Sequence, residues 1–167
     1  MAKISGIRTM TESGFTLAEL VAIILLVGIL AFTAIPRFSG PSLRVDAQAE
    51  QLASDIRYTQ TLAMTRGDRF RINLSATGYQ ITSSTGATTV VHPGTGSTNA
   101  VALNGVTLSG WNPPLTNNYV AFDGRGVPYS LYTSSTGLAA NATITLSGGG
   151  SQRNLVISPE TGRVALQ

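Results

Sequence analysis

An uncharged apolar run near the N-terminus is the feature that most constrains this chain. Residues Leu20–Ile35 read LVAIILLVGILAFTAI, and no acidic or basic side chain interrupts them. Counted from Phe15 to Ile35 and wound as an α-helix, the segment is about 31 Å long, enough to cross the hydrocarbon core of a bilayer. The sequence therefore predicts one membrane-spanning helix close to the N-terminus.

A cleaved secretory signal peptide is the alternative interpretation of this segment. Lys3 and Arg8 precede the apolar run, as basic residues do in a signal peptide. We favour a retained helix, because the run is longer than a typical signal core and Ala34-Ile35-Pro36 is only a partial small-residue cleavage site. Charge does not fix the orientation, because Arg37 and Arg44 flank the other side.

One carboxylate breaks the apolar pattern. Glu19 lies inside the expected helix, where an ionised carboxylate costs about 2.5–3.5 kcal/mol at the bilayer centre and less near an end. Two interpretations remain open: Glu19 is solvated at the depth of the lipid headgroups, or it pairs with a cation at the same depth. A free amino group on Phe15, produced by a cut after Gly14 and presented by a neighbouring subunit, would be such a cation.

The residues around this carboxylate resemble a known processing signal. The stretch Gly14-Phe15-Thr16-Leu17-Ala18-Glu19-Leu20 follows a short polar, basic segment and precedes an apolar helix that carries Gly28 and Pro36. It closely resembles the class III leader of type IV pilins and type II secretion pseudopilins. In that family a prepilin peptidase cuts after the glycine and methylates the new N-terminal residue.

The resemblance implies a role for each matching residue. Residues 1–14 would be a leader peptide removed by cleavage after Gly14, and Phe15 would become the N-methylated N-terminus. Glu19 would aid assembly by pairing with the N-terminal amine of the adjacent subunit. The leader would lie in the cytoplasm, and the globular part would lie in the periplasm outside the bacterial inner membrane. The implied partners are other pilin or pseudopilin subunits, the prepilin peptidase, the inner-membrane assembly platform and inner-membrane lipid.

Gly28 and Pro36 are candidate positions for a bend in the helix. Glycine removes side-chain packing and weakens the helix, while proline deletes a backbone donor and disrupts the preceding turn. We expect the helix, which we assign to residues 15–36 as a transmembrane or filament-core segment, to bend or unwind between the two. The alternative is that glycine and proline are simply commoner in membrane helices than in soluble ones.

A second helical pattern follows the Ser39-Gly40-Pro41 break. Apolar residues recur in steps of four, three, four and seven at Val45, Ala49, Leu52, Ile56 and Ala63. The polar positions off this line are Arg44, Gln48, Gln51, Asp55 and Arg57. This pattern predicts an amphipathic helix that ends at Gly67-Asp68. We assign residues 37–67 to this second half of the N-terminal helix, packed on the following domain, with a coiled-coil seam as the alternative.

The remaining residues, 68–167, have the composition of a β domain with tight turns. From Ser75 to Ser151, 41 of 77 residues are Gly, Ser, Thr or Asn, and only Asp123 and Arg125 are charged. Short runs of strand-forming residues between turn residues predict antiparallel hairpins. The expected strands are Phe70–Leu74, Tyr79–Thr82, Thr88–Val91, Val101–Leu108, Tyr119–Phe122, Ala142–Leu146, Leu155–Ile157 and Val164–Leu166. The predicted fold class is α+β, pilin-like: a long N-terminal helix, transmembrane then amphipathic, packed on an antiparallel β-sheet domain.

Three later segments resemble one branch of the family. Leu52–Gly67, Phe122–Gly126 and Pro159–Val164 look like the GspH/FimT branch, which contains minor pilins and the secretion pseudopilin GspH. The chain has no cysteine, unlike many major pilins, which carry a C-terminal cysteine pair. The resemblance implies a minor type IV pilin or pseudopilin, a structural subunit of a pilus or of a type II secretion pseudopilus.

The sequence offers little for catalysis, for a cofactor or for a metal. With no cysteine and one histidine, thiolate and His-rich zinc sites are excluded. His92 would need Asp123 or Asp68 to build a Ser/His/Asp site, and no nucleophile-elbow sequence supports one. We expect a solvent-facing histidine beside the Pro93-Gly94 turn and no enzymatic activity. Asp123-Gly124-Arg125-Gly126 has one carboxylate, too few for calcium, and predicts a tight turn.

Arginines near the end of the second helix form the only basic concentration in the sequence: Arg57, Arg66, Arg69 and Arg71. Solvated charge is the favoured interpretation, and contact with DNA or a partner is the alternative. Some FimT-like minor pilins bind DNA through a C-terminal Gly-Arg-x-Arg motif. Gly162-Arg163-Val164-Ala165 keeps the first arginine and has alanine at the second, a departure that argues against DNA binding. The alternative function is a membrane-tethered module that binds DNA during uptake or a secreted substrate.

Overall fold

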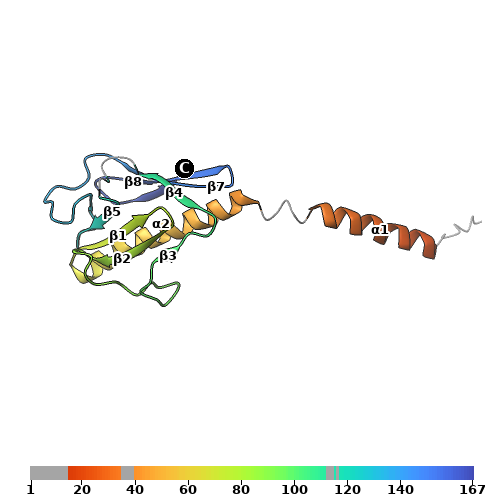
Figure 1. Cartoon of the computed structure of the whole chain (residues 1–167), viewed down its shortest axis with the longest axis horizontal. Coiled ribbons are helices and arrows are strands. Elements are labelled where there is room, and N and C mark those ends of the chain that lie inside the picture. Colours follow the sequence, from red (N-terminus) through yellow and green to blue (C-terminus); the bar gives the residue numbers. More distant parts are fainter. Residues whose placement is uncertain (1–14, 35–39, 112–114, 116) are drawn as a thin grey trace, which may run out of the picture. The chain divides into compact units, whose positions relative to one another are not determined.

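The computed structural model describes residues 15–34, 40–111, 115 and 117–167, and the chain divides into two units, residues 1–39 and Gly40–Gln167. In the first unit, helix α1 spans Leu17–Ala34 (Figure 1). Across the described parts of the chain, no helix combines the length and the apolarity needed to cross a membrane. The expected leader, Gly14 and Pro36 lie outside the described residues.

The second unit begins with helix α2, which spans Pro41–Arg66. Proline at the first helical position is favourable because its missing N–H would have no partner there. Gly67 ends the helix in the left-handed conformation, with φ 65°. The predicted apolar stripe is confirmed, since all five of its residues are fully buried: Val45, Ala49, Leu52, Ile56 and Ala63. Asp55, which we expected off the buried line, is also buried.

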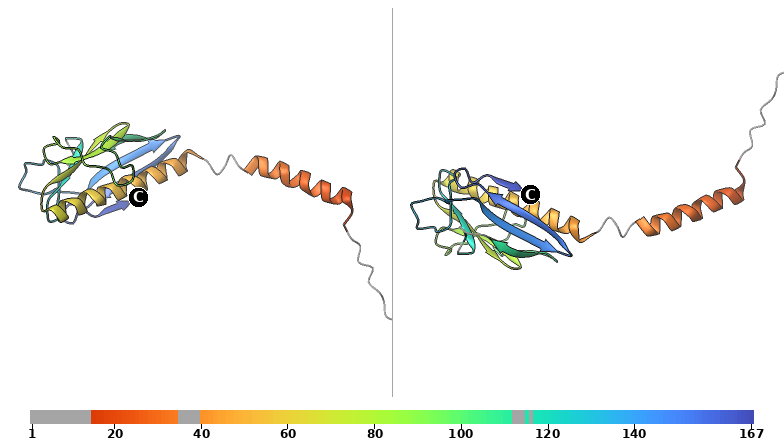
Figure 2. Two further views of the ribbon diagram at one scale, coloured as in Figure 1. Left: turned by 90° about the horizontal axis from the view of Figure 1, so that it is seen from below. Right: turned by 90° about the horizontal axis from the view of Figure 1, so that it is seen from above.

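Two antiparallel sheets pack on α2, which contacts strands of both sheets (Figure 2). The first sheet has the order β3-β2-β1-β5-β6 and contains β1 (Phe70–Ser75), β2 (Gly78–Ser83), β3 (Val101–Ala102), β5 (Tyr119–Phe122) and β6 (Pro128–Tyr129). The second has the order β4-β7-β8-β9 and contains β4 (Thr107–Trp111), β7 (Ala142–Gly148), β8 (Ser151–Ile157) and β9 (Val164–Leu166). The predicted α+β class, with a helix on antiparallel strands, is confirmed.

Strand β1 shows how the sequence selects the buried face. Phe70, Ile72 and Leu74 are buried in the core shared with α2, while Arg71 and Asn73 alternate with them and are half-buried. Because successive strand side chains point to opposite faces, the two polar residues lie on the outer face of the first sheet. Pairing of Ile72 with Ile81 of β2 keeps the apolar residues of both strands in register.

The strand predictions differ from the structure at several positions. The run Val101–Leu108 forms two strands in different sheets, because Gly105, with φ 71°, turns the chain between them. Thr88–Val91 forms only an isolated bridge between Thr89 and Thr82. The two-residue strand β6 was not predicted. The polar first half of β8 also escaped prediction, since its pairing with β7, rather than an apolar pattern, makes it a strand.

Candidate assembly helix and arginine surface

Thr16 caps the first turn of α1. The backbone N–H of Glu19 donates to the carbonyl oxygen of Thr16 at 3.1 Å and to its Oγ1 at 3.3 Å. Threonine followed three residues later by glutamate is the signature of a capping box, in which both side chains satisfy backbone donors. The sequence expectations miss this cap, although the Thr-x-x-Glu spacing signals it. The helix start therefore engages the backbone N–H of Glu19 and not its carboxylate.

The surface of α1 is apolar and exposed on every side. All side chains from Phe15 to Ala31 are exposed, among them Leu17 at 82% and Leu30 at 66%. The helix continues through Gly28, beside which the space is open. A helix that is apolar all round is normally covered by lipid or by other protein, because such a surface is unfavourable in water. Glu19 is the one carboxylate on this surface.

Gln60 of α2 joins two turns of the β domain. Its Nε2 donates to the carbonyl oxygen of Gly126 at 2.9 Å, in the β5–β6 turn, and to that of Thr161 at 2.7 Å, in the β8–β9 turn. Gly162 packs into this junction with φ +63°, where an added Cβ would lie 2.6 Å from Gln60 Nε2. The three segments that resemble the GspH/FimT branch thus meet at one place in the fold.

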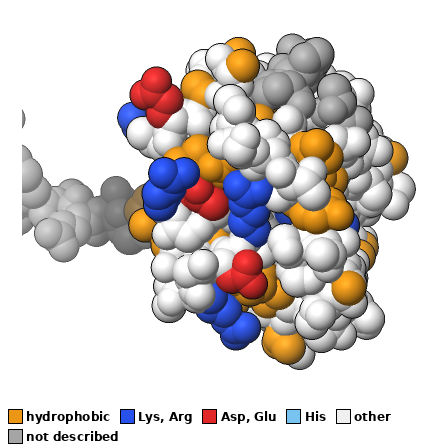
Figure 3. Space-filling view, turned by 90° about the vertical axis from the view of Figure 1, so that its left-hand side faces the viewer, with side chains coloured by type: hydrophobic (Ala, Val, Ile, Leu, Met, Phe, Trp, Pro, Cys, Tyr) orange, Lys and Arg blue, Asp and Glu red, His pale blue; other side chains and the backbone are white. Residues whose placement is uncertain are grey.

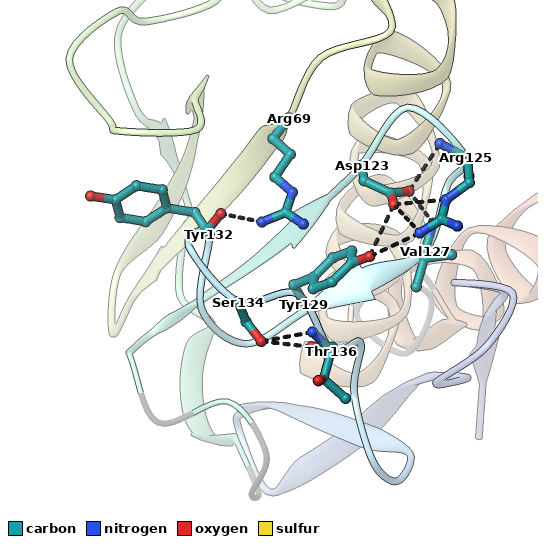
Figure 4. A network of polar contacts seen from close by, with 8 residues as sticks. All are labelled: Arg69, Asp123, Arg125, Val127, Tyr129, Tyr132, Ser134 and Thr136. Carbon is teal, nitrogen blue, oxygen red and sulfur yellow. Dashed lines mark hydrogen bonds and ion pairs between the residues drawn. The ribbon is translucent and has the colours of Figure 1, made fainter.

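Asp123 closes the β5–β6 turn (Figure 4). Its Oδ1 accepts the N–H of Arg125 at 2.9 Å and of Val127 at 3.0 Å, and its Oδ2 accepts the Tyr129 hydroxyl at 3.0 Å and the Arg125 guanidinium at 3.1 Å. Burial raises the pKa of Asp123, but these hydrogen bonds favour the charged form and together hold the pKa below its ordinary value. The predicted tight turn is confirmed.

Two arginines rest on tyrosine rings at the outer face of the first sheet. The Arg69 guanidinium carbon lies 4.2 Å from the centre of the Tyr129 ring, and its Nη1 donates to the Tyr132 carbonyl oxygen (Figure 4). Arg71 lies 4.5 Å from the Tyr119 ring. Both arginines are half-buried, and in the described part of the chain neither guanidinium pairs with a carboxylate. These two side chains are therefore fixed by aromatic contacts rather than freely solvated.

The other candidate contact arginines are exposed. Arg66 lies 5.7 Å from the Phe70 ring, and Arg163 has no hydrogen bond or ion pair from its guanidinium to any described residue. Arg57 Nη2 donates to the carbonyl oxygen of Val164 at 3.1 Å. Figure 3 shows basic and acidic side chains interspersed on one end of the domain. Among the described residues, no hydrogen bond or ion pair joins Arg163 to the arginines near the end of α2.

His92 is buried, contrary to the expected solvent-facing position. The side chain is inserted between α2 and β2, where the residue is 4% exposed. Its Nε2 lies 2.8 Å from Oδ2 of Asp55, and its Nδ1 accepts the N–H of Gly94 at 3.1 Å and of Thr95 at 3.2 Å. The Tyr79 hydroxyl donates to the same Asp55 oxygen at 2.5 Å. This shared network explains why Asp55 is buried.

The network differs from the Ser/His/Asp site considered from the sequence. The carboxylate next to His92 is that of Asp55 in α2, not of Asp68 or Asp123. Nδ1 accepts hydrogen bonds, whereas Nε2, although 2.8 Å from Asp55 Oδ2, is buried without an aligned hydrogen bond to a described residue. Burial, followed by the hydrogen bond to Asp55, raises the pKa of Tyr79 far above its ordinary value. The arrangement holds the segment around His92 in place.

Two shallow grooves mark the surface of the second unit. The first, of about 310 Å³, contains the ion pair between Arg153 Nε and Asp46 Oδ1 and is lined by Asp46, Ala49, Glu50, Arg153, Leu166 and Gln167. The second, of about 300 Å³, is lined by Tyr58, Arg66, Phe70, Ser83, Thr88, Thr89, Val90 and Val91. Among the residues that the structure describes, no group of three or more His, Asp or Glu side chains could hold a metal ion.

Comparisons with known proteins agree with this architecture. The family described as type II transport protein GspH matches residues 48–162. The chain is 30% identical to the pilin-like protein PilA1 of Thermus thermophilus over 165 residues, covering 95% of this chain and all of that protein. It is similar in structure to the type IV minor pilin FimU of Pseudomonas aeruginosa, with a TM-score of 0.51, 16% identity, and coverage of 73% of this chain and 91% of FimU.

At 16% identity, the similarity to FimU indicates a shared fold only. The family match and the identity to PilA1 indicate which family the chain belongs to. The family and the fold are those of structural pilin subunits. The family match extends from the first third of α2 to the β8–β9 turn, so it includes the junction built around Gln60. The chain therefore belongs to the GspH family and is a minor pilin or pseudopilin.

Proposed function

We propose that this protein is a pilus or pseudopilus subunit that is anchored in the bacterial inner membrane and assembles through α1. A prepilin peptidase removes residues 1–14 by cutting after Gly14, and Phe15 becomes the methylated N-terminus. Residues 15–36 cross the membrane and later line the filament core, residues 37–67 form the amphipathic second half, and residues 68–167 form the periplasmic β domain. The observation that carries the proposal is an exposed helix that is apolar apart from Glu19 and Thr33, with the carboxylate of Glu19 in its first turn.

Glu19 is the residue on which assembly depends in this proposal. An ionised carboxylate among apolar helices is strongly penalised unless a cation pairs with it. After cleavage, the Phe15 amine of an adjacent subunit would supply that cation, and their pairing would set the axial register between subunits. The Thr16 side chain accepts the backbone N–H of Glu19, and a glutamate at this position of a capping box is also able to support the helix start. The test must separate the charge from the cap.

Glu19→Gln separates them, since glutamine can complete a capping box but carries no charge. We expect the mature variant, identified by mass spectrometry as starting at methylated Phe15, to stay in the membrane but to enter pili or pseudopili at least about tenfold less often, a loss of about 1.4 kcal/mol. Thr16→Ala is the matched control: it removes the cap and keeps the charge, so incorporation should stay near the wild-type level. Normal incorporation of Glu19→Gln would refute the assembly role.

A membrane-tethered binding module is the second candidate function. The observation in its favour is the Arg163 guanidinium, which is exposed and has no partner among the described residues. Phosphate contacts by such arginines would give DNA binding that falls steeply with salt. A gel-shift titration of the full chain in detergent micelles tests this. No shift at low salt excludes DNA, whereas a shift lost in Arg163→Ala but kept in Glu19→Gln favours the module.

A further inference from the structure

The turn between β3 and β4 contains an asparagine followed by a glycine, Asn104-Gly105. Both residues are exposed, and Gly105 has φ +71°. Among the described residues, neither the Asn104 side-chain amide nor the Gly105 N–H has a hydrogen-bond partner. A Cβ added at Gly105 would meet one atom within 4 Å, Arg44 Nη1 at 3.8 Å. A side-chain amide carbon and a backbone nitrogen are thus adjacent in the chain, and neither is shielded.

These two groups can react with each other. The Gly105 nitrogen loses its proton to hydroxide and attacks Cγ of Asn104. The bond from Cγ to the side-chain nitrogen then breaks, and the leaving nitrogen takes a proton from water and departs as ammonia. Water opens the resulting succinimide ring at either carbonyl group and leaves aspartate or isoaspartate in place of Asn104. The reaction needs no oxidant, reductant or cofactor, because the chain itself holds the reacting groups together.

A side chain of α2 favours the reactive form of the nitrogen. Gln48 Nε2 donates to the backbone carbonyl oxygen of Asn104 at 2.9 Å. This carbonyl belongs to the peptide group that contains the Gly105 nitrogen, so resonance places part of the charge left by deprotonation on the accepting oxygen. Because a hydrogen bond to a charged acceptor is stronger than one to a neutral acceptor, the Gln48 contact stabilises the attacking anion.

The orientation of the Gln48 amide is set by this contact. Its Oε1 is buried and has no hydrogen-bond partner among the described residues. The reverse orientation would place Oε1 against the Asn104 carbonyl oxygen, and both are acceptors, so Nε2 faces the turn. A buried amide oxygen without a partner costs free energy. A side chain of the same length without an amide should therefore be tolerated at this position.

We propose that the Asn104-Gly105 turn is a self-modifying site, at which Gln48 accelerates the conversion of Asn104 into aspartate and isoaspartate. Each event replaces a neutral amide by a carboxylate beside Arg44, which forms no ion pair with a described residue. Isoaspartate also adds a methylene group to the backbone. The modification thus changes the charge and the length of a connection between the two sheets as the protein ages.

Asp123-Gly124 is the other place where the sequence has Asp or Asn before glycine, and it lacks these features. Both carboxylate oxygens of Asp123 accept hydrogen bonds, and the residue is 8% exposed. These hydrogen bonds hold the pKa of Asp123 below its ordinary value, so the group is ionised at neutral pH and repels an attacking anion. The contacts, rather than the residue types, single out the Asn104 turn.

Incubation of the full chain in detergent micelles, in mildly alkaline buffer, tests the site. Peptide mass spectrometry measures the conversion of each asparagine, and fragmentation distinguishes isoaspartate from aspartate. Asn99 is the reference in the same molecule, because it is exposed but is followed by Ala100. We expect Asn104 to convert at least about tenfold faster, a barrier lower by about 1.4 kcal/mol, and to give both products. Equal rates, or aspartate without isoaspartate, would overturn the proposal.

Gln48→Met removes the donor and keeps the length and the helix propensity of the side chain. We expect conversion of Asn104 to slow at least about fivefold, equivalent to about 1 kcal/mol, with Asn99 unchanged. Gln48→Glu is a second variant, whose ionised carboxylate cannot donate and should slow conversion as well. Gln51→Met is the matched control: it makes the same change at an exposed position of α2 and should keep the wild-type rate.

Concentrated denaturant breaks the contact between Gln48 and the turn, so wild type and Gln48→Met should then convert Asn104 equally fast. An unchanged rate in folded Gln48→Met and Gln48→Glu would overturn the role of Gln48. The same slowing in Gln51→Met, or a difference that persists in denaturant, would also overturn it, because the effect would not depend on the contact at 2.9 Å.

Discussion

Gly162 occupies a position where left-handed backbone and close packing coincide. Its φ is +63°, and an added Cβ would lie 2.6 Å from Gln60 Nε2 and 2.7 Å from the Gly126 carbonyl oxygen. We expect Gly162→Ala to lower the free energy of unfolding by about 1–2 kcal/mol for the backbone strain and by about 1–3 kcal/mol more for the overpacking. Urea denaturation measures the sum. Gly96→Ala is the control, because Gly96 has φ +65° but open space around it. Equal losses in the two variants would mean that the Gln60 junction adds nothing.

Individual residues differ in how far the sequence predicts their positions. The α2 stripe was predictable because periodicity alone places Val45 and Leu52 on one face. Asp55 and His92 were not, because the burial of each depends on a partner far away in the chain, which no local pattern reveals. Likewise, the sequence predicts a solvated Arg71, whereas in the structure its guanidinium lies over the Tyr119 ring.

At the scale of an element, the β5–β6 turn depends on one ionised carboxylate. The hydrogen bonds to Asp123 lower its pKa in the folded state, so their stabilisation is complete above the unfolded pKa of about 3.9 and is lost as the pH falls through the lower folded value. We expect Asp123→Asn to reduce the free energy of unfolding by about 1–3 kcal/mol at pH 7, and the difference from wild type to shrink as the pH falls below about 4.

Asp68→Asn is the control for this pH series. Asp68 is exposed and its side chain accepts one hydrogen bond, from the backbone N–H of Arg69. The free energy of unfolding of Asp68→Asn should therefore differ from that of the wild type by a nearly constant amount at every pH. A gap between Asp123→Asn and wild type that stays constant from pH 7 into strong acid would contradict the assignment of the turn to the charged carboxylate.

Elements were predictable where composition and turn chemistry agree. Phe70–Leu74 and Tyr119–Phe122 were expected as strands and form β1 and β5. The prediction of a single strand over Val101–Leu108 was wrong. Its apolar residues belong to strands of two different sheets on either side of the Asn104-Gly105 turn. Which sheet a strand joins depends on its pairing partner, β2 for β3 and β7 for β4, and single runs of strand-forming residues carry no information about that choice.

For the whole molecule, the distribution of buried residues predicts that the two units fold separately. Every described member of the apolar core lies between Val45 and Val164, and none comes from α1. The free energy that drives folding of the β domain is therefore contained in Gly40–Gln167, since apolar burial is its dominant favourable term. The described side chains of α1 are exposed.

We accordingly expect a fragment of residues 40–167 to unfold in one cooperative transition in buffer without detergent. Its free energy of unfolding should lie within about 1 kcal/mol of that of the domain in the full chain held in micelles, because the fragment keeps every core contact. Urea denaturation followed by circular dichroism measures both. The full chain without detergent is the matched comparison and should self-associate through α1. A fragment that loses its cooperative transition would show that α1 contributes to the folded domain, and would refute the division into two independent units.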